Sequence, residues 1–156
     1  MRAQPQLLRK AALAAVVLWA AFQPLRGQGG AIVVTTLADS GSGSLRAAIV
    51  NANDGDVITF ATNGTITNLT GELMISKSLD IVGPGPGSLV VSGNNSSRVF
   101  NIAGWAVVNL SGLAICNGHA HDGAKGTNSA TPGWPGDDGG GIYNSGTLAL
   151  TNCVIT

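Results

Sequence analysis

Histidines and carboxylates gather in one Gly-rich stretch of the chain, residues 117–140. Imidazole and carboxylate groups are zinc ligands, so His119, His121 and one carboxylate could hold Zn²⁺. Asp137 and Asp138 could instead hold Ca²⁺ together with backbone oxygens, and we assign these two residues as the candidate metal site. Neither spacing is specific for a metal. The alternative interpretation is therefore a solvated, Gly-rich bulge with scattered polar residues.

The same stretch contains the candidate ligand-binding residues, Trp134 and Asp122. The Trp134 indole lies between two prolines and could stack on a sugar ring, or it could fold back onto the protein surface. No catalytic residue is predicted, because acid–base chemistry on a sugar needs carboxylates or basic residues gathered on one face. The carboxylates upstream are instead dispersed along the chain, at Asp54, Asp56, Glu72 and Asp80.

A 40-residue repeat indicates how these residues are positioned. A shift of the chain by 40 positions places apolar residues on apolar residues without a gap, in the pairs Ile102/Ile142, Val108/Leu148, Leu110/Leu150, Leu113/Cys153 and Ile115/Ile155. A weaker copy of the same pattern comprises Leu73, Ile75, Leu79 and Ile81. Residues that repeat at a fixed offset let each strand lie parallel to its copy, about 4.8 Å away. Such imperfect copies are typical of a solenoid.

The chain divides into a leader at 1–29, an amino-terminal strand and capping helix at 30–56, and repeating strands at 57–156. The helix is expected over Ser44–Asn53, with Ser42 or Ser44 as its cap. Its apolar stripe should cover the open end of the stacked strands. The expected strands cover residues 31–37, 57–60, 64–67, 72–83, 89–92, 98–102, 106–117, 141–144 and 147–156. Because no capping segment follows the last strand, we expect the repeat to be incomplete at this end, as in a piece of a longer protein.

Residues 1–29 have the layout of a secretory signal peptide. Basic residues precede an apolar run from Ala11 to Phe22, which is shorter than the roughly 20 residues that span a bilayer. An uncleaved membrane anchor is the alternative. Cleavage near Gly29 leaves four basic and eight acidic residues, a net charge of −4. A mildly acidic, charge-poor chain is not expected to bind nucleic acid, and no transmembrane span should remain after cleavage.

The two cysteines, Cys116 and Cys153, are not expected to form a disulfide. The repeat places Cys153 at an inward position and Cys116 next to one, so that the two side chains point to opposite faces. Cysteines on opposite faces cannot reach the geometry of a disulfide without distortion. Cys153 is therefore expected to be a small buried hydrophobic residue.

Several motifs together resemble the start of bacterial secreted right-handed parallel β-helix proteins, of the CSLREA-type and polymorphic outer-membrane-protein-like groups. They are the leader and the segments VTTLADSGSGSLRAAIVNAN, DVITF, GELMISKSLDIVGPG and GGGIYNSGTLALTNCVIT. The chain departs from the family's helix motif, because Gly43 stands at the position of its Cys and Ala47 at the position of its Glu. The resemblance implies an all-β, right-handed parallel β-helix with a short amino-terminal capping helix, preceded by a signal-peptide helix.

The resemblance also implies a protein that is secreted, extracellular or associated with the outer membrane. We expect a structural or adhesin-like module that binds glycans or surface proteins and has no evident catalytic site. The alternative is a carbohydrate-active enzyme, a pectate-lyase-like polysaccharide lyase or hydrolase whose catalytic groove lies mostly downstream. Fold by itself does not choose between these functions.

Overall fold

The computed structural model describes residues 29–123 and 135–156, so the expected signal-peptide helix lies outside the described residues. Short strands dominate this part of the chain. The elements are β1 (Ala31–Val34), α2 (Leu45–Asn51), β2 (Asp56–Phe60), β3 (Gly64–Thr67), β4 (Leu73–Ile75), β5 (Leu79–Val82), β6 (Leu89–Ser92), β7 (Phe100–Ile102), β8 (Val107–Ser111), β9 (Ala114–Cys116), β10 (Ile142–Asn144), β11 (Thr147–Thr151) and β12 (Val154–Ile155).

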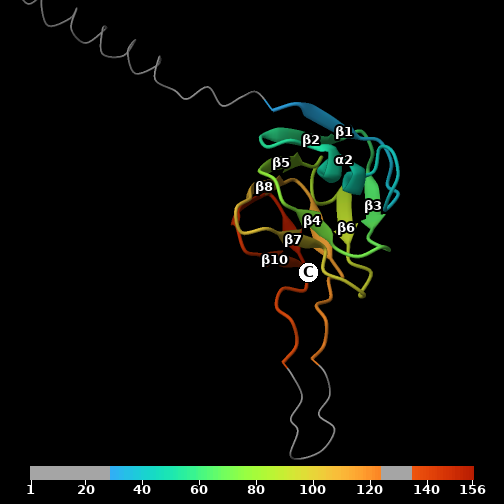
Figure 1. Ribbon diagram of the computed structural model, residues 1–156. Coiled ribbons are helices and arrows are strands. Elements are labelled where there is room, and N and C mark those ends of the chain that lie inside the picture. Colours follow the sequence, from blue (N-terminus) through green and yellow to red (C-terminus); the bar gives the residue numbers. More distant parts are fainter. Residues whose placement is uncertain (1–28, 124–134) are drawn as a thin grey trace, which may run out of the picture.

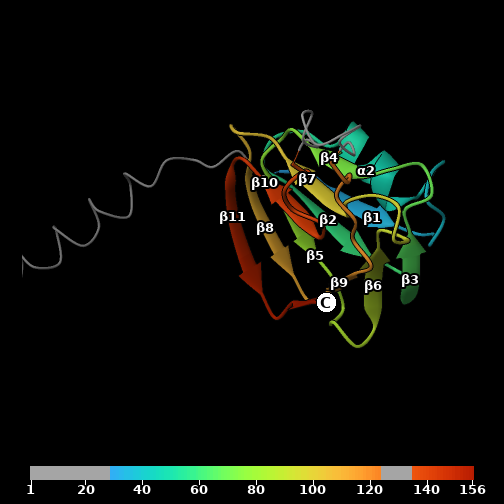
Figure 2. The ribbon, with the colours of Figure 1, turned by 90° about the horizontal axis from the view of Figure 1, so that it is seen from below.

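The strands form three sheets. The five-stranded sheet has the order β1-β2-β5-β8-β11, the four-stranded sheet β12-β9-β6-β3, and the three-stranded sheet β10-β7-β4. Every strand pair is parallel. From β2 onward, consecutive strands enter the five-, four- and three-stranded sheets in turn, so neighbours within a sheet come from successive passes of the chain. Figure 2 shows the fan formed by β1, β2, β5, β8 and β11.

Each sheet contributes a column of inward-facing apolar side chains to one hydrophobic core, because alternate residues of a strand point to the same face. The columns are Ile58, Ile81, Leu110 and Leu150; Ile66, Val91, Ile115 and Ile155; and Leu73, Phe100 and Ile142. Ile81 and Ile115 are completely buried, whereas Leu150 and Ile155 in the last layer are 43% and 50% exposed. The core is thus closed in the middle layers and open at the layer of β10, β11 and β12.

The 40-residue offset predicts part of this register. Leu110 pairs with Leu150 and Ile115 with Ile155, as the repeat predicts. The prediction for Ile102 and Ile142 is wrong, because Ile142 pairs with Phe100. The weaker upstream copy is also out of phase: Leu79 pairs with Val108 and Ile81 with Leu110, at an offset of 29 residues. The offset changes because the turns between strands differ in length from one pass to the next.

The expected fold class is corrected by this arrangement. Three separate parallel sheets and one short helix take the place of the single right-handed β-helix solenoid that the repeat and the resemblance predicted. A fixed offset between apolar residues specifies which strands lie side by side and that they run parallel. It does not specify how strands divide among sheets, because the turns between consecutive strands decide that.

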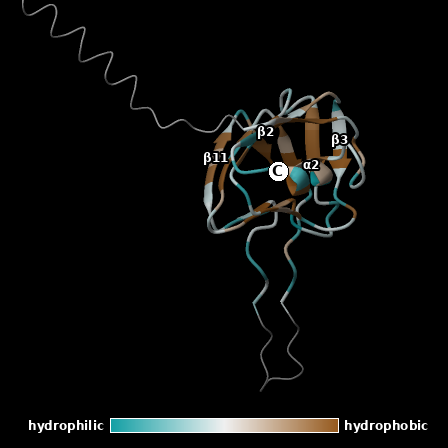
Figure 3. Ribbon diagram, turned by 45° about the horizontal axis from the view of Figure 1, so that its top comes forward, coloured by the Kyte–Doolittle hydropathy of each residue, from teal (hydrophilic) through white to brown (hydrophobic). Residues whose placement is uncertain are grey.

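The helix α2 lies at the end of the core opposite β10, β11 and β12. It packs against β1 and β4, the outermost strands of two sheets. Its stripe of Leu45, Ala48 and Ile49 is buried, as the sequence predicts, and Figure 3 shows the helix among largely hydrophobic strands. Ser44 is the N-cap, with its hydroxyl accepting from the amide of Ala47. Among the described residues, no helix is long and apolar enough to cross a membrane.

Candidate functional site

The Gly-rich stretch leaves the sheets between β9 and β10, and its two described arms run side by side away from β7 and β10 (Figure 1). Backbone hydrogen bonds hold the arms together and to the sheet. The His119 amide donates to the Ser97 carbonyl at 2.9 Å, and the Asp137 amide donates to the His121 carbonyl at 2.9 Å. The amide of Val99 donates to the Gly141 carbonyl at 3.1 Å. This pairing brings Asp137 and Asp138 beside the residues that precede β7.

An arginine that the sequence did not single out lies at the base of these arms. Arg98 precedes β7, and its side chain is only 13% exposed. Its Nη1 lies 3.5 Å from Glu72 Oε2, and its Nη2 lies 3.3 Å from Asp137 Oδ2. Its Nε donates to the Asp138 carbonyl at 2.9 Å, and the Tyr143 ring centre lies 5.0 Å from the guanidinium carbon. We call Glu72, Arg98, Asn101, Asp137 and Tyr143 the Arg98 cluster.

Three neighbouring strands place this cluster on the outer face of the three-stranded sheet. Met74, Asn101 and Tyr143 pair with one another across β4, β7 and β10. Their side chains therefore point to the same side, away from the core column of Leu73, Phe100 and Ile142. The side-chain Nδ2 of Asn101 donates to Glu72 Oε1 at 2.7 Å. Both oxygens of the Glu72 carboxylate are thus engaged within the cluster.

The contacts of the Arg98 cluster connect the Gly-rich stretch to the three-stranded sheet. A planar guanidinium can bind several oxygens at once, and it can stack on an aromatic ring. The Tyr143 contact contributes about 0.5–2 kcal/mol. Asp137 is 53% exposed, so its ion pair with Arg98 adds less than about 1 kcal/mol. Together these contacts hold the second arm of the Gly-rich stretch on the sheet.

The candidate metal residues are only partly brought together. The Asp137 carboxylate lies 3.4 Å from His121 Nδ1 as well as near Arg98, and Asp138 contributes its carbonyl oxygen to Arg98. Within residues 29–123 and 135–156, no group of three or more His, Cys, Asp or Glu side chains has an arrangement that could hold a metal ion. A cation next to Asp137 would also meet the positive charge of Arg98, which disfavours Ca²⁺ binding there.

Of the two candidate ligand residues, the structure describes Asp122. The side chain of Asp122 is 92% exposed, and its Oδ1 lies 4.0 Å from His119 Nε2. Trp134 lies outside the described residues. The proposed zinc ligands His119 and His121 make separate carboxylate contacts, to Asp122 and to Asp137 respectively. His119, His121 and Asp122 therefore lie along the arms and do not converge on one point.

A second arginine connects α2 to the turn between β3 and β4. Arg46 donates to Asp39 Oδ1 from Nη2 at 2.8 Å and to the carbonyls of Gly71 and Glu72 at 2.6 and 2.8 Å. The other Asp39 oxygen accepts from the Thr70 amide and hydroxyl at 2.9 and 2.6 Å. Burial by itself would raise the pKa of Asp39, but the hydrogen bonds from Thr70 and Arg46 and the Arg46 charge outweigh it, and this pKa is lowered. Arg46 therefore connects the helix, Asp39 and the turn before β4.

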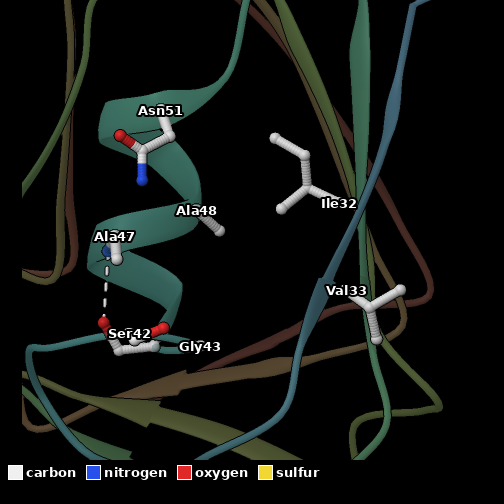
Figure 4. Close-up of a pocket in the computed structure, with 8 residues that line it drawn as sticks. Ile32, Val33, Ser42, Gly43, Ala47, Ala48 and Asn51 are labelled. Carbon is white, nitrogen blue, oxygen red and sulfur yellow. Dashed lines mark hydrogen bonds between the residues drawn. The ribbon is translucent and has the colours of Figure 1, made fainter.

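A cavity of about 290 Å³ lies between β1 and α2 (Figure 4). Its apolar wall includes Ile32 and Ala48, which face each other across the space. One of its polar groups, the Ser44 hydroxyl, already accepts from Ala47 and donates to the Gly41 carbonyl at 2.7 Å. The size is at the low end for small-molecule sites. The other polar side chains of the lining are Ser42 and Asn51, so within the cavity no titratable side chain is available for acid–base chemistry.

The two cysteines are free and half-buried. Cys153 packs against the hydrophobic core, and its sulfur lies 3.5 Å from the carbonyls of Leu110 and Thr151. Cys116 ends β9, where it pairs with Ser92 of β6. Cys116 thus lies in a strand and Cys153 in the turn between β11 and β12, and the two have different neighbours.

No protein-family model matches this chain, and no curated protein sequence matches it. The residues that sequence reasoning missed are Arg98, Asn101 and Tyr143. The 40-residue repeat could have indicated Arg98, because Asp138 lies 40 positions after it. In the structure, the Nε of Arg98 donates to the carbonyl of Asp138.

Proposed function

We propose that this protein is an exported structural and adhesive module that acts outside the cell or at its surface and binds glycans or surface proteins. The observation that supports this function best is the set of contacts that the Arg98 guanidinium makes within the protein. Each of its three nitrogens faces an oxygen of the protein, and its side chain is largely covered. A guanidinium occupied in this way holds a loop on a rigid sheet, which is how binding loops are commonly presented.

Export is part of the proposal. It is supported by the layout of residues 1–29 and by the resemblance of the following motifs to secreted and surface-attached bacterial proteins. Expression of the full chain in a bacterial host should yield a protein whose amino terminus, measured by mass spectrometry, lies near Gly29. A product that still carries Ala11 to Phe22 would mean an uncleaved membrane anchor instead.

A carbohydrate-active enzyme is the second candidate function, and one observation favours it. Glu72 and Asp137, which are 65 positions apart in the chain, both lie within 3.5 Å of Arg98 on one outer face. Paired carboxylates are the groups that cleave glycosidic bonds, and the sequence had suggested that the carboxylates were dispersed. Both carboxylates contact Arg98, however, and these contacts favour a role in holding the Gly-rich stretch on the sheet.

An activity assay separates the two functions. The full chain is incubated with polygalacturonate in the presence of Ca²⁺, and with neutral polysaccharides, while new chain ends are measured. A structural and adhesive module releases none above background but is retained on an immobilised polysaccharide or on whole bacterial cells. Cleavage that disappears in both Glu72→Gln and Asp137→Asn, with the melting temperature preserved, would replace the proposal by the enzyme.

A further inference from the structure

An exposed tryptophan lies on a face of the protein that the Arg98 cluster does not use. Trp105 precedes β8 and is 75% exposed, the highest value among the large hydrophobic residues that the structure describes. Its indole Nε1 donates to the Ser76 carbonyl at 2.9 Å. The hydrogen bond fixes one edge of the ring while most of its surface remains open to solvent. An indole left in water contributes little hydrophobic stabilisation to the fold, and its open ring face is available to a ligand.

Two outward residues of β8 continue from the tryptophan. Val107 is 50% exposed, and Asn109 is the next residue on the same face of the strand, about 7 Å further along. The Val107 amide donates to the Ser78 hydroxyl at 3.2 Å, and the Asn109 side chain donates to Asp80 Oδ1 at 2.5 Å. We call Trp105, Val107, Asn109 and Asp80 the Trp105 strip.

The hydrogen bonds below the strip make it rigid. The contacts from Trp105 to Ser76, from Val107 to Ser78 and from Asn109 to Asp80 all join residues 29 positions apart. They therefore lock one layer of the structure onto the next along the whole length of the strip. A preorganised surface loses little conformational entropy when a ligand binds to it.

The chemistry of the strip matches a carbohydrate. The electron-rich face of an indole packs against the C–H face of a sugar ring, and the apolar Val107 extends that contact. Beyond its bond to Asp80, the side chain of Asn109 has a second N–H and a carbonyl oxygen, and the carboxylate of Asp80 has a second oxygen. Hydrogen-bond donors and acceptors for the hydroxyl groups of a sugar therefore lie at the end of the strip away from Trp105. An apolar surface with a few fixed polar groups is typical of small-ligand sites.

The charges around the strip decide which carbohydrate it suits. Asp80 lies in the strip, and Asp54 accepts from the Ser78 amide at 2.7 Å next to it. The nearby cation is Lys77, whose ammonium group donates to the carbonyls of Val50 and Ala52 at the end of α2. A negative field disfavours uronates and other acidic sugars. We infer that the Trp105 strip binds a neutral glycan, an inference that rests on the proposed adhesive function and names its ligand.

Isothermal titration of the full chain tests the inference. The probes are cellohexaose, mannohexaose and an unbranched galactan hexasaccharide, with hexagalacturonate as the acidic comparison. At least one neutral probe should bind, and hexagalacturonate should not. Trp105→Ala should weaken binding by about ten-fold or more, as expected for an aromatic anchor, and Asn109→Ala by about two- to five-fold. Trp105→Phe keeps an aromatic face and should retain most of the affinity.

A matched control variant and a fluorescence measurement distinguish loss of binding from loss of folding. Leu69 is another exposed apolar residue, 70% exposed, in the turn between β3 and β4, and Leu69→Ala should leave binding unchanged. The bound probe should also shield part of the wild-type indole fluorescence from acrylamide, and this shielding should be absent in Trp105→Phe, which removes the covered indole.

Two results would overturn the inference: no neutral probe binds to the wild type, or binding survives Trp105→Ala in a protein that melts normally. If the chain still adheres to cells in either case, the adhesive function stands and only the assigned surface is wrong. If the chain neither adheres nor binds any probe but cleaves polysaccharides, the proposed function itself fails.

Discussion

At the scale of single residues, two arginines hold the connections between strands in place. Arg46 fastens the turn between β3 and β4 to α2, and Arg98 fastens the Gly-rich stretch to the three-stranded sheet. Both use several nitrogens at once, which a lysine cannot do because its ammonium group is a compact point charge. Arg46 satisfies the backbone carbonyls of Gly71 and Glu72, so its loss would leave acceptors without partners as well as an unpaired Asp39.

The Asp39 contacts predict a dependence of stability on pH. Because the pKa of Asp39 is lower in the folded protein than its ordinary value, the carboxylate stabilises the fold above that ordinary value. This contribution is lost as the pH falls through the lowered pKa. Asp39→Asn should cost about 1–2 kcal/mol near pH 6, and the difference from wild type should shrink as the pH falls below the ordinary pKa of 3.8 and through the lowered pKa of the folded protein.

Urea unfolding followed by circular dichroism at several pH values measures this effect. Asp122→Asn is the matched control, because the Asp122 side chain is 92% exposed. The stability of this variant should follow that of the wild type at every pH. A gap between wild type and Asp39→Asn that stays constant down to about pH 2 would contradict the assigned role of the carboxylate.

At the scale of elements, the turns decide which sheet each strand enters. The turn between β8 and β9 contains Gly112 with φ of +64°, and the equivalent turn between β11 and β12 contains Asn152 with φ of +50°. Glycine and asparagine are the residues that adopt this left-handed conformation most readily. The two positions are 40 residues apart, so the corner recurs together with the strands that it joins.

These equivalent corners should respond differently to substitution. A Cβ on Gly112 would lie 2.3 Å from the Gly83 carbonyl oxygen, so Gly112→Ala combines a clash with an unfavourable φ. The change should destabilise the protein by about 1–3 kcal/mol. Asn152→Gly keeps the conformation accessible and should alter stability by less than about 0.5 kcal/mol. Thermal unfolding of both variants provides the measurement, and equal losses would show that the corner geometry is not the cause.

At the scale of the whole molecule, the core is closed at one end by α2 and open at the layer of β10, β11 and β12. The same inward column can therefore hold a completely buried residue and a half-exposed one, as Ile115 and Ile155 do in the four-stranded sheet. Burial, not residue type, determines how much each side chain stabilises the fold, since the hydrophobic contribution scales with the apolar area removed from water.

A pair of identical substitutions tests this gradient. Ile81→Ala removes a completely buried side chain and should cost about 2–5 kcal/mol, including the cavity that it leaves. Ile155→Ala removes a side chain that is 50% exposed and should cost less than about 1.5 kcal/mol. Denaturant unfolding gives the two losses of unfolding free energy, from the shift of the midpoint at an unchanged dependence of the free energy on denaturant concentration. Similar costs would mean that the last layer is covered in solution, for example by a second molecule.

The sequence by itself determined the local elements and part of their pairing. The alternation of apolar residues predicted the strands, the apolar stripe and Ser44 predicted α2, and the 40-residue offset predicted that Leu110 and Leu150 would pair in parallel. These features depend on periodicity along the chain, which can be read directly from residue types.

Only the tertiary structure decided how the strands divide among three sheets and which polar residues meet. The cluster of Glu72, Arg98 and Asp137 depends on the lengths of turns, which shift the offset between layers of the three-stranded sheet from 27 residues, between Leu73 and Phe100, to 42, between Phe100 and Ile142. A single fixed offset cannot predict contacts across such changes. The Trp105 strip was missed for the same reason, because its partners lie 29 positions upstream and only the stacking of layers brings them together.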